Sequence, residues 1–358
     1  MRTLKYSFGL LYSLMAMITI SSCEEFPTAT QEFLEEISGL TPSGDYSPIR
    51  GGFPQGDTKY DSIINDIKNE YGVYLLYKDI TEEDLNRDWV SEGTGDIYVG
   101  GYENERNDRS WNLPEEHLPF YVSYFNDYIF PNITKEFANS TLPVKIYMIH
   151  NLRTEPRDFG DGNEGDGGGA GTATDPFKSI KLGNFDNWAI SFKEEVINGD
   201  NAEYALRQQR CIFMIQAIYN AIEKGEMTSP DEFWSGFDFS TDKKMNNVDP
   251  NKPNYKYKLG FVDMINDNFG TGVQKQVWVP AMANETSCYY WEKDKYPHYN
   301  LFTTYIKNAM WLTPEDFEAR YPKSEYPMIH EKYDIIVNHM LDTYGIDLAG
   351  IARGIQKN

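Results

Sequence analysis

Apolar residues recur at three- and four-residue spacing through one stretch near the middle of the chain, from Tyr204 to Lys224. An α-helix has 3.6 residues per turn, so this spacing gathers them on one broad face. The residues of that face are Cys211, Ile212, Ile215, Ile218, Tyr219 and Ile222. We therefore expect a buried helix over residues 204–224, around which the rest of the fold packs.

Elsewhere in the chain, segments with the three- to four-residue spacing of helices are followed by short apolar runs typical of strands. Tyr60, Ile63, Ile64 and Ile67 predict a helix, and the run Tyr71–Lys78 after them predicts a strand. Residues 111–137 read as a helical segment, residues 143–149 as a strand, and residues 180–192 as a strand and turn. A mixture of this kind predicts an α+β fold.

The first 22 residues have the pattern of a secretory signal. Arg2 and Lys5 precede an uncharged apolar run, and small residues stand just ahead of Cys23. The apolar run is too short for a comfortable membrane span. We expect cleavage before Cys23 and acylation of that cysteine, which would anchor the protein in a membrane; a plain secreted protein is the alternative.

The next segment, residues 23–56, mixes acidic residues with prolines and glycines and shows no sustained period. Such a sequence predicts a flexible lipidated tether, which leaves residues 57–358 as the folded domain. The formal net charge is −22, and loss of Arg2 and Lys5 with the signal lowers it to about −24. This negative charge argues against nucleic acid as a partner.

Two amides stand beside the apolar stripe of the central helix. Gln216 and Asn220 are four residues apart, the spacing at which the two histidines of a zincin HExxH motif hold one zinc ion. The residue corresponding to the glutamate of that motif is Ala217, which cannot accept a proton. An amide is also a poor substitute for imidazole as a zinc ligand.

The serial order of these segments resembles the Bacteroidota surface lipoproteins known as substrate-import-associated zinc metallohydrolases, or zinc-binding metallopeptidases. The resemblance runs from the YGVYLLYK strand to the C-terminal MIHEKYDIIVNHMLDTYGIDL. It implies a zincin-like fold with HExxH on the central helix and an acidic third ligand downstream. In this chain Gln216, Ala217 and Asn220 stand at the first motif, and Thr304 stands where the acid is expected.

The resemblance therefore implies a vestigial cleft and a non-catalytic pseudo-metallopeptidase, with no zinc expected as a cofactor. It also implies an outer-membrane, cell-surface accessory of a nutrient uptake system. Its partners would be a TonB-dependent transporter and its lid lipoprotein, and its ligand a peptide or a glycan. The alternative is an active zinc metallohydrolase whose ligands lie elsewhere in the sequence.

Other candidate sites are weaker. His330, Glu331 and Asp334 spell HExxD, but we interpret them as the solvated face of a helix that begins near Pro327. His117, His150 and His298 share no ligand spacing, so we interpret them as isolated groups. The glycine-rich run 158–174 lacks the spacing of a calcium loop and predicts a surface loop. Acidic pairs such as Glu115 and Glu116 read as helix starts rather than glycosidase carboxylates.

Overall fold

The computed structural model describes residues 49, 51–81, 84–85, 96–99, 112–156, 177, 179–183, 187–199, 202–237, 249–269 and 301–354. These residues fall within one compact unit. The expected signal, the acylated Cys23 and the glycine-rich run 158–174 lie outside the described residues, as does His298.

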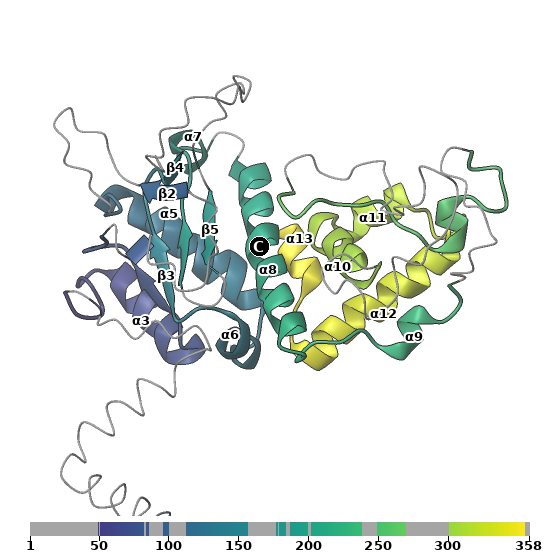
Figure 1. The fold of residues 1–358 in the computed structure, drawn as a ribbon, viewed down its shortest axis with the longest axis horizontal. Helices are drawn as coiled ribbons and strands as arrows, with labels where there is room; N and C mark the ends of the chain where they lie inside the picture. The colour runs from purple at the N-terminus through teal and green to yellow at the C-terminus, as the bar shows by residue number, and fades with distance from the viewer. Residues whose placement is uncertain are drawn as a thin grey trace, which may run out of the picture. The chain divides into compact units, whose positions relative to one another are not determined.

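A four-stranded sheet in the order β1-β3-β6-β5 forms one part of the fold (Figure 1). Its strands are Tyr74–Leu76 (β1), Lys145–Met148 (β3), Asn187–Ile190 (β6) and Ile180–Gly183 (β5). The first three are parallel, with Leu75 opposite Ile146 and Ile146 opposite Trp188, and β5 runs antiparallel to β6. The strands Asp96–Val99 (β2) and Arg153–Pro156 (β4) form a separate antiparallel pair.

Helix α3, Lys59–Tyr71, leads into β1. The Thr58 side chain caps the first turn, and the Asp61 carboxylate accepts a hydrogen bond from the Thr58 main-chain N–H. The helix ends because Gly72 adopts a left-handed conformation with φ of 73°. Gln55 lies within the predicted tether, and its side chain accepts from Tyr77 N at 2.7 Å and donates to Lys78 O at 2.7 Å. The predicted domain boundary at residue 57 stays a prediction.

The helical segment expected over residues 111–137 is divided into shorter pieces. They are Glu115–His117 (η1), Leu118–Ser123 (α5), the π-helical Tyr124–Ile129 (η2), Phe130–Asn132 (η3) and Lys135–Thr141 (α6). Pro131 lacks an N–H to donate, and it lies in η3, where this helical run ends before the extended Ile133. The prediction of helix was right, and the prediction of one continuous segment was wrong.

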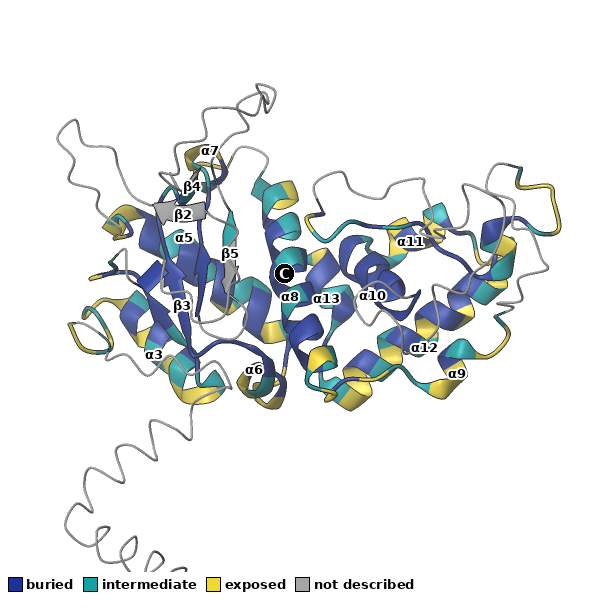
Figure 2. Ribbon diagram, viewed as in Figure 1, coloured by how far each residue is buried: buried dark blue, intermediate teal, exposed yellow. Residues whose placement is uncertain are grey.

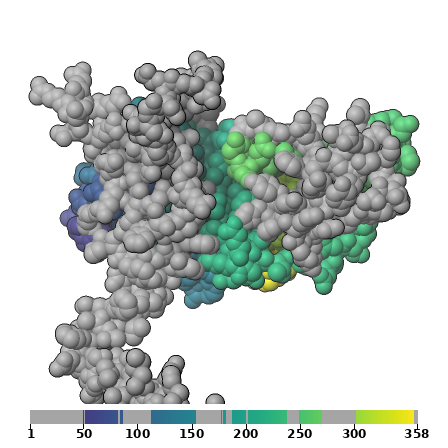
Figure 3. Space-filling model, viewed as in Figure 1, coloured from purple at the N-terminus to yellow at the C-terminus, as the bar shows by residue number. Residues whose placement is uncertain are grey.

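Helix α8, Ala202–Glu223, confirms the predicted central helix. It contacts β5 and α6 on one side of the fold and α10 and α13 on the other (Figure 1). Cys211, Ile215 and Ile218 are buried as the pattern required, and Figure 2 shows the dark blue of buried residues along most of the helix. The first turn is less enclosed, since Tyr204 is 49% exposed and teal atoms of this part of the chain reach the surface in Figure 3.

The remaining elements are helical. They are Glu194–Ile197 (α7), Asp231–Trp234 (α9), the 3-10 turn Lys256–Leu259 (η4), Leu301–Trp311 (α10), Pro314–Arg320 (α11), Pro327–Tyr344 (α12) and Leu348–Arg353 (α13). The buried carboxylate of Asp263 ties η4 to α11, because it accepts from Lys256 at 2.7 Å and Tyr257 at 2.6 Å, both in η4, and from Arg320 at the end of α11. A buried charge with this many donors is satisfied and stabilises the packing.

The structure confirms the α+β class: it is mostly helical, with a small and largely parallel sheet. The zincin-like part of the expectation stays a prediction. None of the helices in the described ranges combines the length and the apolar character that a membrane span requires.

Candidate metal centre

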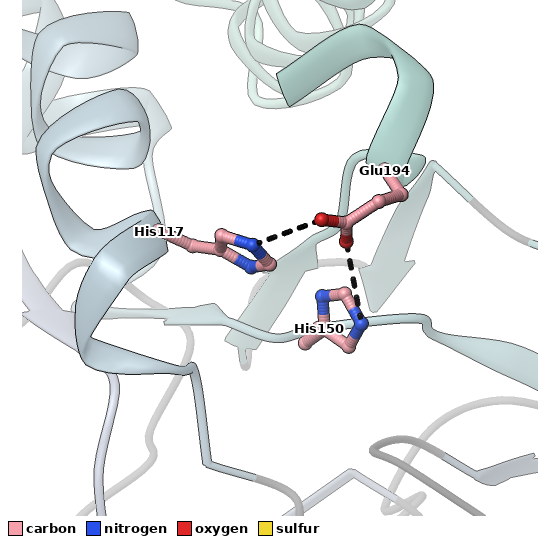
Figure 4. A group of neighbouring side chains, drawn as sticks. All are labelled: His117, His150 and Glu194. Carbon is pink, nitrogen blue, oxygen red and sulfur yellow. Dashed lines mark ion pairs between the residues drawn. The ribbon is translucent and has the colours of Figure 1, made fainter. Parts of the chain in front are cut away.

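Two histidines and a glutamate from separate elements converge at one edge of the sheet. His117 ends the 3-10 turn η1, His150 follows β3, and Glu194 is the first residue of α7. One ligand atom from each, a ring nitrogen or a carboxylate oxygen, lies within 4.8 Å of the others. Figure 4 shows the Glu194 carboxylate facing both imidazole rings.

The topology of the sheet accounts for two of the three positions. Strands β3 and β6 are parallel neighbours, with Met148 opposite Ile190, so their carboxyl ends meet at the same edge. His150 comes just after the first strand and Glu194 just after the second. In α/β folds, ligands commonly bind outside the carboxyl ends of parallel strands.

Tyr121 brings the third residue into place. Its buried hydroxyl donates to Ile149 O at 2.8 Å and accepts from Phe192 N at 2.9 Å, so it bridges the ends of β3 and β6. His117 lies one helical turn before Tyr121, at the start of the same helical run. The fixed position of Tyr121 therefore also fixes where the His117 ring enters the site.

The site combines buried rings with an accessible carboxylate. His117 Nε2 lies 3.4 Å from Glu194 Oε1, and His150 Nε2 lies 4.0 Å from Glu194 Oε2. His117 and His150 are 5% and 6% exposed, whereas the Glu194 side chain is 55% exposed.

Burial lowers the pKa of His150 below its usual value, and the positive charge of a protonated His117 lowers it further. Glu194 and Glu116 act in the opposite direction. The net direction favours a neutral His150 ring near pH 7. A neutral imidazole has the free lone pair that a metal ion requires.

The donor set fits a divalent transition-metal ion. Two imidazoles and one carboxylate make up the protein ligands of several catalytic zinc sites, which keep a further position open. Zinc ligands lie about 2.0–2.2 Å from the ion, so the three groups would need to close in slightly. His117 Nδ1 is buried without a hydrogen-bond partner among the described residues, and a cation bound to this ring would offset part of its desolvation.

A cavity of about 300 Å³ opens beside the cluster. His150 and Glu194 line it together with Asn151, Arg153, Phe177 and Lys193. Phe192 and Glu195 complete the described part of its wall. An ion held by the three ligands would therefore lie next to a space large enough for part of a small molecule.

The residues predicted for the vestigial cleft lie elsewhere. Gln216 Nε2 donates to Asn220 Oδ1 at 3.1 Å, and the buried Asn220 donates through Nδ2 to Thr141 O at 3.0 Å. The amides thus face each other as the spacing required, and Asn220 links α8 to α6.

Ala217 is fully buried on the same helix. Thr304 is a buried residue of α10, and its carbonyl accepts from Asn308 Nδ2 at 2.9 Å. Gln216 thus bonds within α8, Asn220 reaches α6, and the Thr304 carbonyl bonds within α10. Whether these positions are remnants of a cleft stays a prediction.

The HExxD run at the start of α12 does not form a shared site, because His330 and Asp334 contact different groups. His330 lies in the first turn of α12, as predicted, but it is buried rather than solvated, with Nε2 at the Tyr321 carbonyl and 3.3 Å from Glu318. Asp334 instead pairs with Lys323 at 3.8 Å on the exposed face. The expectation of a solvated face was thus wrong for His330, because α11 packs over it.

The interpretation of His117 and His150 as isolated groups was wrong as well. Their ring centroids lie 5.0 Å apart. Sequence spacing could not reveal this, because the three ligands come from three elements that only the tertiary fold brings together. One signal was available: His150 follows the apolar run 143–149 directly, at the expected end of a strand.

Comparisons with known proteins give one match of note. No protein-family model and no curated protein matches the sequence. The chain is similar to a solved structure described as a "putative zinc-binding metallo-peptidase" from Bacteroides caccae ATCC 43185, with a TM-score of 0.33 and 10% sequence identity. The match covers 83% of this chain and 92% of that one.

Proposed function

We propose that this protein is a metal-dependent hydrolase whose centre is formed by His117, His150 and Glu194. The observation that carries the proposal is the convergence of these three side chains beside a cavity. This assignment favours the alternative drawn from the sequence, an active zinc metallohydrolase with ligands outside the HExxH position. The zincin-like fold remains part of the proposal, supported by the serial order of the sequence segments.

In the proposed hydrolase, the metal ligands, the cavity wall and Tyr121 have different roles. The buried rings of His117 and His150 hold the ion from the protein side, and Glu194 completes the set from the solvent side. Zinc in such a site lowers the pKa of bound water and polarises a carbonyl group. The cavity wall orients the substrate, and Tyr121 keeps the ligand-bearing segments in register.

The cellular setting is proposed from the sequence alone. Cleavage before Cys23 and acylation of that residue would attach the protein to the outer membrane and expose the domain at the cell surface. A TonB-dependent transporter and its lid lipoprotein are then the proposed partners, and a peptide or a glycan the proposed ligand. In that setting the hydrolase would cleave the peptide or glycan into smaller pieces before import.

Cleavage of a mixed peptide library, followed by mass spectrometry, tests the proposal. Protein dialysed against chelator is compared with the same protein given stoichiometric Zn²⁺. We expect zinc-dependent cleavage that Glu194→Gln abolishes. Glu136→Gln is the matched control, because Glu136 is an exposed carboxylate of α6 that pairs with Lys135 at 3.8 Å.

The possible outcomes separate the two functions. Zinc-dependent cleavage in wild type and in the Glu136→Gln control supports the hydrolase. Tight zinc binding without cleavage of peptides or of a matching glycan library favours the non-catalytic accessory. Cleavage that survives in Glu194→Gln would show that the catalytic centre lies elsewhere.

A further inference from the structure

The cavity beside the metal centre has two basic residues in its wall. Arg153 begins β4, and Lys193 precedes Glu194 at the start of α7. Each follows one of the two parallel strands that lead to a proposed ligand: the segment after β3 carries His150 and Arg153, and the segment after β6 carries Lys193 and Glu194. The fold that assembles the ligands therefore also assembles a pair of cations next to them.

Local contacts orient both cationic groups. Arg153 Nε donates to Asn151 Oδ1 at 3.2 Å. Asn151 adopts a left-handed conformation, with φ of 54°, which few residues other than glycine and asparagine tolerate. Lys193 Nζ lies 5.2 Å from the centre of the Phe177 ring. The two cations are thus held at the cavity by a side-chain amide and by an aromatic face.

The charge of the cavity changes when the metal site is filled. Without an ion, Arg153 and Lys193 are balanced by Glu194 and Glu195 in the same wall. A divalent ion between the two histidines and Glu194 adds two positive charges, so the cavity becomes locally positive. The whole chain carries a formal charge of −22, which makes this positive region a local feature.

From this arrangement we propose that the cavity selects substrates with an anionic group, a carboxylate or a phosphate, next to the bond that is presented to the metal centre. Arg153 and Lys193 would hold that group, since guanidinium and ammonium groups form charge-assisted hydrogen bonds with such oxygens. The cavity of about 300 Å³ suits a single end group rather than a long chain. This inference rests on the proposed metal-dependent function.

Titration calorimetry of the zinc-loaded full-length protein tests the proposal with three probes. Hippurate carries a carboxylate, phenyl phosphate carries a phosphate, and hippuramide is the neutral counterpart of hippurate. We expect at least one anion to bind about tenfold or more tightly than hippuramide. Preference for hippurate would identify a carboxylate site, and preference for phenyl phosphate a phosphate site.

Variants then assign the effect to the two side chains. Arg153→Gln and Lys193→Gln should each remove most of the anion preference while zinc affinity and thermal stability stay close to wild type. Arg153→Lys, which keeps the charge, should retain part of it. Lys135→Gln removes an exposed lysine of α6 and serves as the control with no expected effect.

Two failures are distinguishable. If wild type binds zinc but binds hippuramide as tightly as both anions, or if Arg153→Gln and Lys193→Gln keep the preference, the anion site is overturned and the metal centre stands. If wild type binds no zinc, the metal centre is overturned and the anion site falls with it.

Discussion

The imidazole rings of His117 and His150 lie with their centroids 5.0 Å apart and their planes inclined by 38°. One ring comes from the start of a helical run and the other from the end of a strand. Both point a nitrogen toward the Glu194 carboxylate (Figure 4). Two buried rings that share a carboxylate at the edge of a cavity are suited to hold a cation.

The first prediction concerns zinc affinity. His117→Gln, His150→Gln and Glu194→Gln should each weaken zinc binding by about 100-fold or more, since a site with two strong protein ligands seldom holds the ion. Competition with a chromogenic chelator measures the dissociation constants. His339→Gln is the control, because His339 lies on α12 and contacts Thr228 O at 3.0 Å.

Glu195→Gln separates true ligation from general charge. Glu195 is an exposed carboxylate directly after Glu194. Its loss should weaken zinc binding by less than about tenfold, as expected for a nearby charge that does not ligate. An equal loss in Glu194→Gln and Glu195→Gln would contradict the assignment of Glu194 as a ligand.

A second prediction assigns Tyr121 as a positioning residue. Tyr121→Phe removes the hydroxyl that bridges Ile149 O and Phe192 N, so it should lower the free energy of unfolding by about 1–3 kcal/mol. It should also weaken zinc binding by about tenfold or more, because the segments carrying His150 and Glu194 lose their common tie.

Tyr305→Phe is the matched control for Tyr121→Phe. The Tyr305 hydroxyl is also buried and donates to Gly260 O at 2.7 Å, within the C-terminal helical part. This variant should lose a similar amount of stability with unchanged zinc affinity. If both variants changed zinc binding equally, Tyr121 would have only a general structural role.

The third prediction tests the amides of the central helix. Asn220→Ala leaves the buried Thr141 carbonyl without its donor, at a cost of about 1–3 kcal/mol in the free energy of unfolding. Gln216→Ala should cost less, because Gln216 is only half-buried. Neither should alter zinc affinity. A marked loss of zinc binding in Asn220→Ala would return the metal site to the HExxH position.

The sequence predicted the central helix well because its signal is local. The apolar stripe over residues 204–224 is a periodic feature of one segment, and the observed helix covers Ala202–Glu223. The strands at 74–76 and 145–148 were anticipated for the same reason, from short apolar runs. Over residues 180–192 the sequence predicted one strand and a turn, and the structure has two antiparallel strands there, β5 and β6. The ends of the strands were predicted less well. The first strand was expected to begin at Tyr71, but Tyr71 is the last residue of α3, and the left-handed Gly72 ends that helix.

The candidate metal centre could not be derived in this way. His117, His150 and Glu194 have no common spacing, and their proximity depends on the parallel pairing of β3 with β6 and on Tyr121. The resemblance directed attention to Gln216 and Asn220, which bond each other on α8, while Asn220 also joins α8 to α6. Strand order is a non-local property, and no motif in the sequence encodes it.

The fourth prediction follows from the burial of Cys211, which raises its pKa from 9.0 to about 12. A pKa that is higher in the folded protein contributes stability that is fully present below pH 9 and is lost as the pH rises toward 12. Denaturation of wild type and Cys211→Ala across pH 8–11 should show wild type losing up to about 1.4 kcal/mol more per pH unit above pH 9. Equal slopes would contradict the raised pKa.

The fifth prediction concerns the membrane anchor. Cys23→Ala removes the proposed acylation site and should release the protein from the outer-membrane fraction, because the chain would keep no lipid. Metabolic labelling with a fatty acid and fractionation of cells measure both effects. A Cys23→Ala protein that still sediments fully with the outer membrane would show that attachment does not depend on this cysteine.

The most direct test of the metal centre is an anomalous-difference map at the zinc edge, from crystals grown with one equivalent of Zn²⁺. The account predicts a single strong peak about 2.0–2.2 Å from a nitrogen of His117, a nitrogen of His150 and an oxygen of Glu194. A fully occupied zinc peak elsewhere, with no density between these three residues, would contradict it.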